Sequence, residues 1–156
     1  MSDDPTKDPR KVRDVQREYA NDKVRVRWEP AYCIHTARCL TALPQVFDAL
    51  SRPWVEIDAA DADEIAETVM LCPTGALHFE RLDGGEQEAA WEPTMVEARP
   101  NGPLFVRGRI IVRKEDGELR EETRAALCRC GGSSNKPFCD GAHRSNGFRA
   151  EGTTKL

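Results

Sequence analysis

The sequence has little with which to build a large hydrophobic core. Aromatic residues make up only 6% of its 156 residues, and 39% are hydrophobic. A small module that buries little apolar surface usually needs a metal or a crosslink to hold its fold. No apolar run is long enough to cross a bilayer, and the first residues lack the apolar core of a signal peptide. We therefore expect a cytoplasmic protein that does not bind membranes.

Two further absences narrow the class of function. The basic residues are not interleaved with aromatic residues, and the pI is about 5.5, which argues against a nucleic-acid partner. The sequence contains no Gly-rich phosphate loop, and no Ser, His or acidic residues spaced as a nucleophile with its base. We therefore expect that the protein is not an enzyme.

Cysteine, in contrast, is well represented. In a reducing cytosol, clustered cysteines favour metal binding over disulfide formation. The cysteines fall into two groups of three, which are Cys33, Cys39 and Cys72, and Cys128, Cys130 and Cys139.

Composition divides the chain into segments. A polar, charged arm is expected over residues 1–22, a small domain over 23–82, a linker rich in Gly, Pro and Glu over 83–100, and a second domain over 101–156. The expected fold class is α+β.

In the first domain, the alternation over residues 23–28 predicts a strand, and residues 76–82 predict a returning strand that pairs with it. Asp61 and Glu64 have the spacing of a capping box at the start of a helix. That helix should end near Cys72, because the residue before a proline is disfavoured in helical geometry.

The second domain is expected to be rich in strands. Apolar residues alternate on either side of Gly108, and Asp116-Gly117 is a turn signal. A further strand then leads into Cys128.

The C-terminal cysteines have the spacing Cys128-x-Cys130-x8-Cys139-x3-His143. Residues two apart on a strand share a face, and residues four apart on a helical turn also share a face. Asp140 is placed to cap that turn, and the backbone of residues 131–133 can present N–H groups to sulfur. These ligand types suit a Cys₃His zinc site as well as an iron–sulfur cluster.

The whole string CRCGGSSNKPFCDGAH matches the CDGSH (NEET-like) pattern at every defined position. Gly102-Pro103-Leu104 and Val106-x-Gly108 also resemble the strand that precedes the cluster in that family. The resemblance implies a [2Fe–2S] cluster held by Cys128, Cys130, Cys139 and His143, and a homodimer formed through this domain. Because the second ring nitrogen of His143 can protonate, the reduction potential should depend on pH, and acid should loosen this ligand.

The N-terminal cysteines follow a ferredoxin pattern with one departure. Bacterial ferredoxins use C-x2-C-x2-C with a distant Cys-Pro. Cys33 and Cys39 take the first and third positions, Cys72-Pro73 supplies the distant one, and Thr36 stands where the middle ligand would be. The alternative interpretation is three free cysteines buried in a small α/β core.

This stretch resembles the divergent single-cluster ferredoxin domain that occurs fused to CDGSH modules. The resemblance covers about residues 23–80 and implies a ferredoxin-like fold with an electron-transfer cluster of the [4Fe–4S] type. Three thiolates hold [3Fe–4S], whereas [4Fe–4S] needs a further ligand, for which His35 is the nearest candidate. His35 can equally be a hydrogen-bonding residue, and His78 is expected to be structural. The matching residues are Cys33-x-His35-x3-Cys39, Pro44-x-x-Phe47, Pro53-Trp54 and Cys72-Pro73-Thr74-Gly75-Ala76-Leu77.

Together the two patterns predict a two-cluster iron–sulfur protein that transfers single electrons between redox protein partners. The alternative is a cluster carrier or a redox or pH sensor that uses the His-ligated site as the labile one. A third interpretation is a zinc-stabilised interaction module. Charge is uneven, with a net −10 over residues 40–100, which indicates either ordinary solvated surface or a pole that orients the protein on a charged redox partner.

Overall fold

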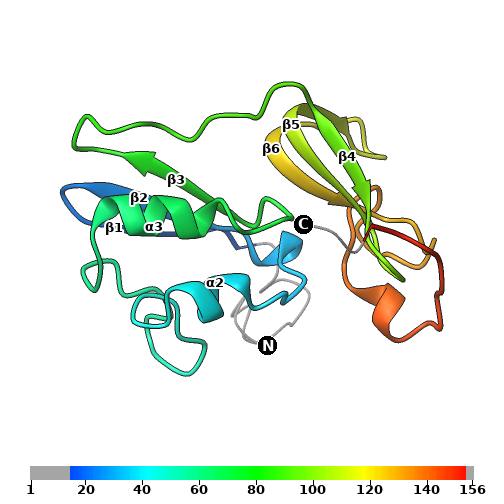
Figure 1. Ribbon diagram of the computed structural model, residues 1–156, viewed down its shortest axis with the longest axis horizontal. Helices are drawn as coiled ribbons and strands as arrows, with labels where there is room; N and C mark the ends of the chain where they lie inside the picture. Colours follow the sequence, from blue (N-terminus) through cyan, green and yellow to red (C-terminus); the bar gives the residue numbers. More distant parts are fainter. Residues whose placement is uncertain (1–14, 154–156) are drawn as a thin grey trace, which may run out of the picture. The chain divides into compact units, whose positions relative to one another are not determined.

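The computed structural model describes residues 15–153, and these form two compact units (Figure 1). The first unit contains the described residues up to Cys72 together with residues 76–88. The second contains residues 73–75 and the described chain from Ala89 onwards.

The first unit is built on a three-stranded antiparallel sheet in the order β1-β2-β3. Its strands are β1 (Arg17–Ala20), β2 (Val24–Trp28) and β3 (Leu77–Arg81). Val24 and Val26 point to one face of β2 and are fully buried, as the alternation predicts. β3 returns antiparallel to β2, also as predicted.

Strand β1 corrects the prediction of an arm over residues 1–22. Residues 1–14 of that arm lie outside the described residues, but Arg17–Ala20 pair with β2. The side chains of β1 are mostly exposed. The strand therefore has no apolar alternation that would reveal it, and its backbone hydrogen bonds to β2 define it instead.

The helices of this unit are η1 (Pro30–Tyr32), α2 (Arg38–Ala42) and α3 (Ala62–Val69). Helix α3 begins with the predicted capping box, in which the Asp61 carboxylate accepts from the Glu64 N–H at 2.9 Å. It ends at Val69, close to the predicted end near Cys72, and the chain there tightens into i→i+3 bonds. The Cys72 N–H donates to the Val69 carbonyl at 3.1 Å.

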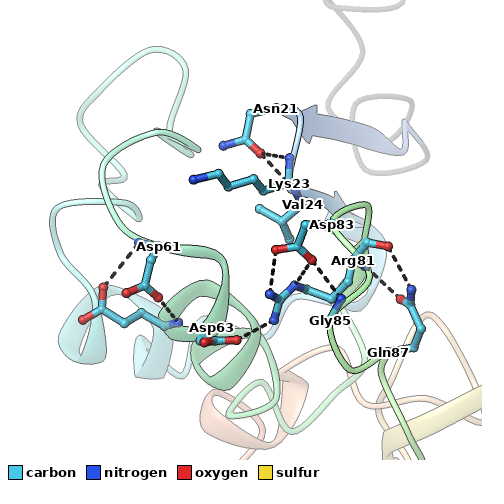
Figure 2. Close-up of polar contacts among 10 residues, drawn as sticks. Asn21, Lys23, Val24, Asp61, Asp63, Arg81, Asp83, Gly85 and Gln87 are labelled. Atoms are coloured by element: carbon cyan, nitrogen blue, oxygen red, sulfur yellow. Dashed lines mark hydrogen bonds and ion pairs between the residues drawn. The ribbon is translucent and has the colours of Figure 1, made fainter.

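Helix α3 packs against the apolar side of the sheet. Figure 2 shows how Arg81 of β3 is also tied by its guanidinium to Asp63 of α3 at 2.6 Å and to Asp83 at 2.9 Å. The Arg81 contacts hold the pKa of Asp83 down at about 2. The buried apolar core comprises Val24, Val26, Leu43, Val46, Phe47, Val55, Ile57, Ala62, Ile65, Val69 and Leu77.

The second unit contains another antiparallel sheet, in the order β4-β5-β6. Its strands are β4 (Met95–Ala98), β5 (Leu104–Arg113) and β6 (Leu119–Leu127). The turn between β5 and β6 forms where predicted, with Gly117 at a positive φ of 89°. Gly108 interrupts the β5–β6 register at a φ of 148°, and a Cβ there would lie 2.4 Å from the Thr94 hydroxyl oxygen.

Strand β4 lies within the predicted linker over residues 83–100, so that linker is not wholly irregular. Met95 and Val96 are exposed, and the strand is a short edge strand that follows a proline. Its composition therefore resembles a loop although its backbone pairs with β5.

The chain thus has the mixed helix and strand content expected of it, with two small sheets. Within the described range of residues 15–153, no helix is long and apolar enough to span a bilayer.

Candidate metal centres

The C-terminal candidate ligands are brought together by a short non-local pairing at the end of β6. The Cys128 N–H donates to the Pro137 carbonyl and the Cys139 N–H donates to the Ala126 carbonyl, each at 2.8 Å. This pairing turns the loop after Cys130 back on itself. Cys139 therefore lies beside Cys128, although the two are eleven positions apart in the sequence.

The four predicted ligands form two close pairs. The Cys128 and Cys130 sulfurs are 3.9 Å apart, and the Cys139 sulfur is 3.5 Å from Nδ1 of His143. Cys128 and Cys130 lie just beyond the end of β6 and not on it, and His143 lies on a short 3-10 helix, η2 (Ala142–Arg144). Among the described residues, no three His, Cys, Asp or Glu side chains form one group around a single metal position.

Backbone N–H groups point at the sulfurs, as anionic thiolates require. The Gly132 N–H donates to Cys130 at 3.3 Å, and the Gly141 N–H donates to Cys139 at 3.4 Å. Gly132 belongs to the predicted segment over residues 131–133, whereas Gly141 was not predicted. Ser133 of that segment instead fixes the loop, since its hydroxyl bonds to the Phe138 carbonyl at 2.5 Å.

Asp140 holds the loop and the turn together. Its carboxylate accepts from the Ala142 N–H at 3.0 Å, where η2 begins, and from the Ser134 N–H at 2.8 Å. The first of these bonds corresponds to the predicted capping role, although the residue at the N-cap position is Gly141.

The protonation of these groups differs with their surroundings. Burial raises the pKa of Cys139, whereas the Gly132 N–H is the main cause of a lowered pKa at Cys130. Burial, with a smaller effect of the Arg144 charge, lowers the pKa of His143. The neutral imidazole that a metal needs is therefore favoured in the folded protein.

The N-terminal cysteines come from three places around the core of the first unit. Cys33 follows η1, Cys39 lies on α2, and Cys72 follows α3. The pKa of Cys39 is raised to about 11, mainly by burial, and the charges of the neighbouring Cys72 and Cys33 contribute to this increase. The three cysteines therefore lie near enough for their charges to influence one another.

His35 lies with this group. Its Nδ1 is 3.7 Å from the Cys33 sulfur. The loop that carries it is tightly curled, since His35 and Ala37 have positive φ values of 57° and 61°. Such values are uncommon for residues with a Cβ and are typical of binding loops.

His78 lies elsewhere. It is buried on β3, and its Nδ1 is 2.9 Å from the Glu88 carboxylate.

Two further contacts of the C-terminal site could not be predicted from the sequence. Asn146 hydrogen-bonds to Cys130, and the Arg129 side chain bonds to the backbone behind the loop. The sequence spacing predicts neither contact, because polar residues such as these are common in any loop.

The donor types of both groups fit iron–sulfur clusters. Soft thiolates with imidazole are ligands for such clusters, and the N–H groups aimed at sulfur suit their negative charge.

Comparison with known proteins gives a match in each half of the chain. Residues 19–81 match the model of a divergent 4Fe-4S mono-cluster domain. Residues 101–144 match the model of the iron-binding zinc finger of CDGSH type. The chain is also 29% identical over 61 residues to the uncharacterized protein YjdI of Escherichia coli K12, covering 39% of this chain and 80% of that protein. YjdI of Escherichia coli O157:H7 gives the same values.

Proposed function

Because this chain is a fusion of a divergent 4Fe-4S mono-cluster domain with a CDGSH-type iron-binding domain, we propose that it transfers single electrons through two iron–sulfur clusters. The observation that carries the proposal is the presence of one Cys/His group in each compact unit, each with the ligand types that iron–sulfur clusters use. When bound, such clusters take up and release one electron at a time. The chain itself supplies the ligands and the hydrogen bonds to them.

In the C-terminal domain the cluster is of the [2Fe–2S] type. Support comes from the arrangement in pairs. The Cys128 and Cys130 sulfurs are 3.9 Å apart, and the Cys139 sulfur is 3.5 Å from the His143 ring. Each pair supplies two of the four protein ligands that the two irons need. A zinc site instead gathers four ligands around one ion.

In the N-terminal domain, which we assign to the ferredoxin-like class, Cys33, Cys39 and Cys72 hold the cluster. The 3.7 Å approach of His35 to Cys33 supports His35 as the fourth ligand of [4Fe–4S]. If His35 does not bind iron, the three thiolates hold [3Fe–4S].

Low-temperature EPR with iron and sulfide analysis tests the proposal on anaerobically purified protein. Oxidised [3Fe–4S] contains three ferric ions and has an odd number of electrons, so it gives a signal before reduction. Oxidised [4Fe–4S] and [2Fe–2S] have even electron counts and become EPR-active only on reduction with dithionite. Two distinct reduced signals from an EPR-silent protein are the expected result. A colourless protein containing zinc, or a protein with a single cluster, contradicts it.

A second candidate function is that of a cluster carrier or a redox or pH sensor. It is favoured by His143, which is partly accessible and lies on a single short turn, so that the ligand is easily released. Transfer of iron and sulfide to an apo-ferredoxin would identify a carrier, whereas rapid reversible reduction without transfer supports the electron carrier. Neither function involves enzymatic turnover.

Redox proteins are the proposed partners, and a second copy of the chain is proposed to pair through the CDGSH-type domain. The short edge strand β4, with Met95 and Val96 exposed, supports such pairing. Sedimentation analysis of the holo-protein would test it, since a monomer at micromolar concentration contradicts the dimer.

A further inference from the structure

Besides its 3.9 Å contact with the Cys128 sulfur, Cys130 receives hydrogen bonds from two N–H donors. One is the backbone N–H of Gly132, at 3.3 Å from the sulfur. The other is the side-chain amide of Asn146, which comes from beyond η2. Cys130 is thus bonded both by its own loop and by the segment that follows the His143 turn.

The orientation of the Asn146 amide is fixed by the chain around it. The Phe148 N–H donates to the Asn146 side-chain oxygen at 3.1 Å. The Asn146 backbone N–H donates to the Ala142 carbonyl at 3.1 Å, which ties the residue to η2. Because the amide oxygen is engaged by Phe148, the NH₂ group is the end that faces the cysteine.

Gly132 leaves the room that this amide occupies. A Cβ added at Gly132 would lie 2.7 Å from the Asn146 side-chain nitrogen and 3.7 Å from the Cys130 sulfur. The amide nitrogen and the sulfur therefore lie on the same side of Gly132. Any larger residue at this position would push the amide away from the cysteine.

We propose that Asn146 is a positioning residue of the CDGSH-type site, whose amide hydrogen bond to Cys130 raises the reduction potential of the bound cluster. This inference rests on the proposed [2Fe–2S] cluster. Hydrogen bonds to the sulfurs are among the factors that set the potential of such clusters. An N–H donor stabilises the additional negative charge of the reduced state more than that of the oxidised state.

The experiment compares four variants of the full chain, purified anaerobically with their clusters. Asn146→Leu removes the donor without adding charge. Gly132→Ala keeps Asn146 but displaces its amide, and the double variant combines the two. Ser145→Ala is the matched control, because the Ser145 hydroxyl bonds only to the Ala142 carbonyl at 3.3 Å in the described structure.

Both single variants should lower the midpoint potential of the CDGSH-type cluster. The double variant should shift the potential no further than the larger single variant, because both substitutions remove the same bond. Ser145→Ala should match the wild type. Resonance Raman of the wild type should show Fe–S(Cys) stretching bands that shift in D₂O, with a smaller shift in Asn146→Leu.

The inference is overturned if Asn146→Leu and Gly132→Ala retain the cluster with the potential and Raman shifts of the control. Additive shifts in the double variant would also overturn it. If either variant fails to retain a cluster, two other measurements test the hydrogen bond. These are the midpoint potential of Asn146→Ala and the D₂O shift of the wild-type Fe–S(Cys) bands, and an unchanged potential with no D₂O shift overturns the inference. A different result would contradict the proposed function itself, namely a wild-type protein that does not contain two irons and two sulfides at this site.

Discussion

Arg129 donates from Nη2 to the backbone carbonyl of Arg99 at 2.6 Å, which ties the chain between two cluster cysteines to the turn that follows β4. The same guanidinium donates to the Gly102 carbonyl at 2.9 Å and to the Glu151 carbonyl at 3.1 Å. It also lies over the ring of Phe148, with 5.4 Å from Cζ to the ring centroid. One side chain thus joins three segments behind the cysteine loop.

Replacing Arg129 should therefore destabilise the CDGSH-type unit. Arg129→Ala removes three charge-assisted hydrogen bonds from a half-buried position, which we expect to cost about 2–4 kcal/mol. Arg129→Lys should recover only part of the lost stability, because an ammonium cannot reproduce the planar guanidinium that bonds to three carbonyls. Urea unfolding of the holo-protein, followed by circular dichroism and by loss of cluster absorbance, measures the effect. Arg149→Ala is the matched control, since Arg149 is exposed and bonds to one neighbouring carbonyl. Equal stability of the Arg129 and Arg149 variants would contradict the prediction.

His143 should determine how the C-terminal cluster responds to acid. Its pKa is lowered from the ordinary value of 6.5, first by burial and then by Arg144. Below that pH, the unfolded chain therefore binds more protons at this histidine than the folded protein does. The free energy of unfolding of the protein with neutral His143 consequently falls as the pH falls. His143→Cys should slow cluster loss below pH 6.5 and lower the reduction potential, because thiolate carries a charge that imidazole lacks. Absorbance decay at several pH values tests this, and identical acid half-lives for the two proteins would refute it.

His35 should decide the number of irons in the N-terminal cluster. His35→Ala removes the imidazole that lies 3.7 Å from Cys33. The expected result is loss of one iron and the appearance of an EPR signal in the oxidised protein, as [3Fe–4S] replaces [4Fe–4S]. His78→Asn is the control, because His78 pairs with Glu88 and lies outside the cysteine group. It should reduce stability and leave the iron count unchanged. An unchanged iron count in His35→Ala would exclude His35 as a ligand.

Features that depend on neighbouring residues could be predicted from the sequence. The capping box of Asp61 and Glu64, the alternation of Val24 and Val26, and the break at Gly108 each follow from spacing within a few residues. Strands β1 and β4 could not be predicted in this way. Both are short edge strands with mainly exposed side chains, and their existence depends on hydrogen bonds to a partner strand.

The candidate ligands were likewise identified by local spacing, but the contacts that surround them were not. The pairing of residues 126–128 with residues 137–139 brings Cys139 to Cys128, and only the folded backbone shows it. Asn146 lies in a polar turn, where an asparagine is typical for reasons unrelated to a cysteine. Its contact with Cys130 arises because η2 returns the chain towards the loop.

Removal of the clusters should unfold the second unit more than the first. Ten of the eleven residues in the buried apolar core of the first unit are larger than alanine. The second unit buries mainly Val106, Val112, Ala125, Ala126 and Phe138, of which two are alanines. Metal ligation should therefore contribute a larger share of its folding free energy.

Hydrogen exchange on anaerobically prepared holo-protein and on protein stripped of iron by chelation tests this difference between the units. Amides of β5 and β6 should lose most of their protection in the stripped protein, whereas those of β2 and α3 should retain a measurable part. Reconstitution with iron and sulfide is the control and should restore protection in both units. If the stripped chain instead unfolds cooperatively at the temperature of the holo-protein, the clusters do not support the fold. Side-chain packing alone would then be sufficient to hold the second unit together.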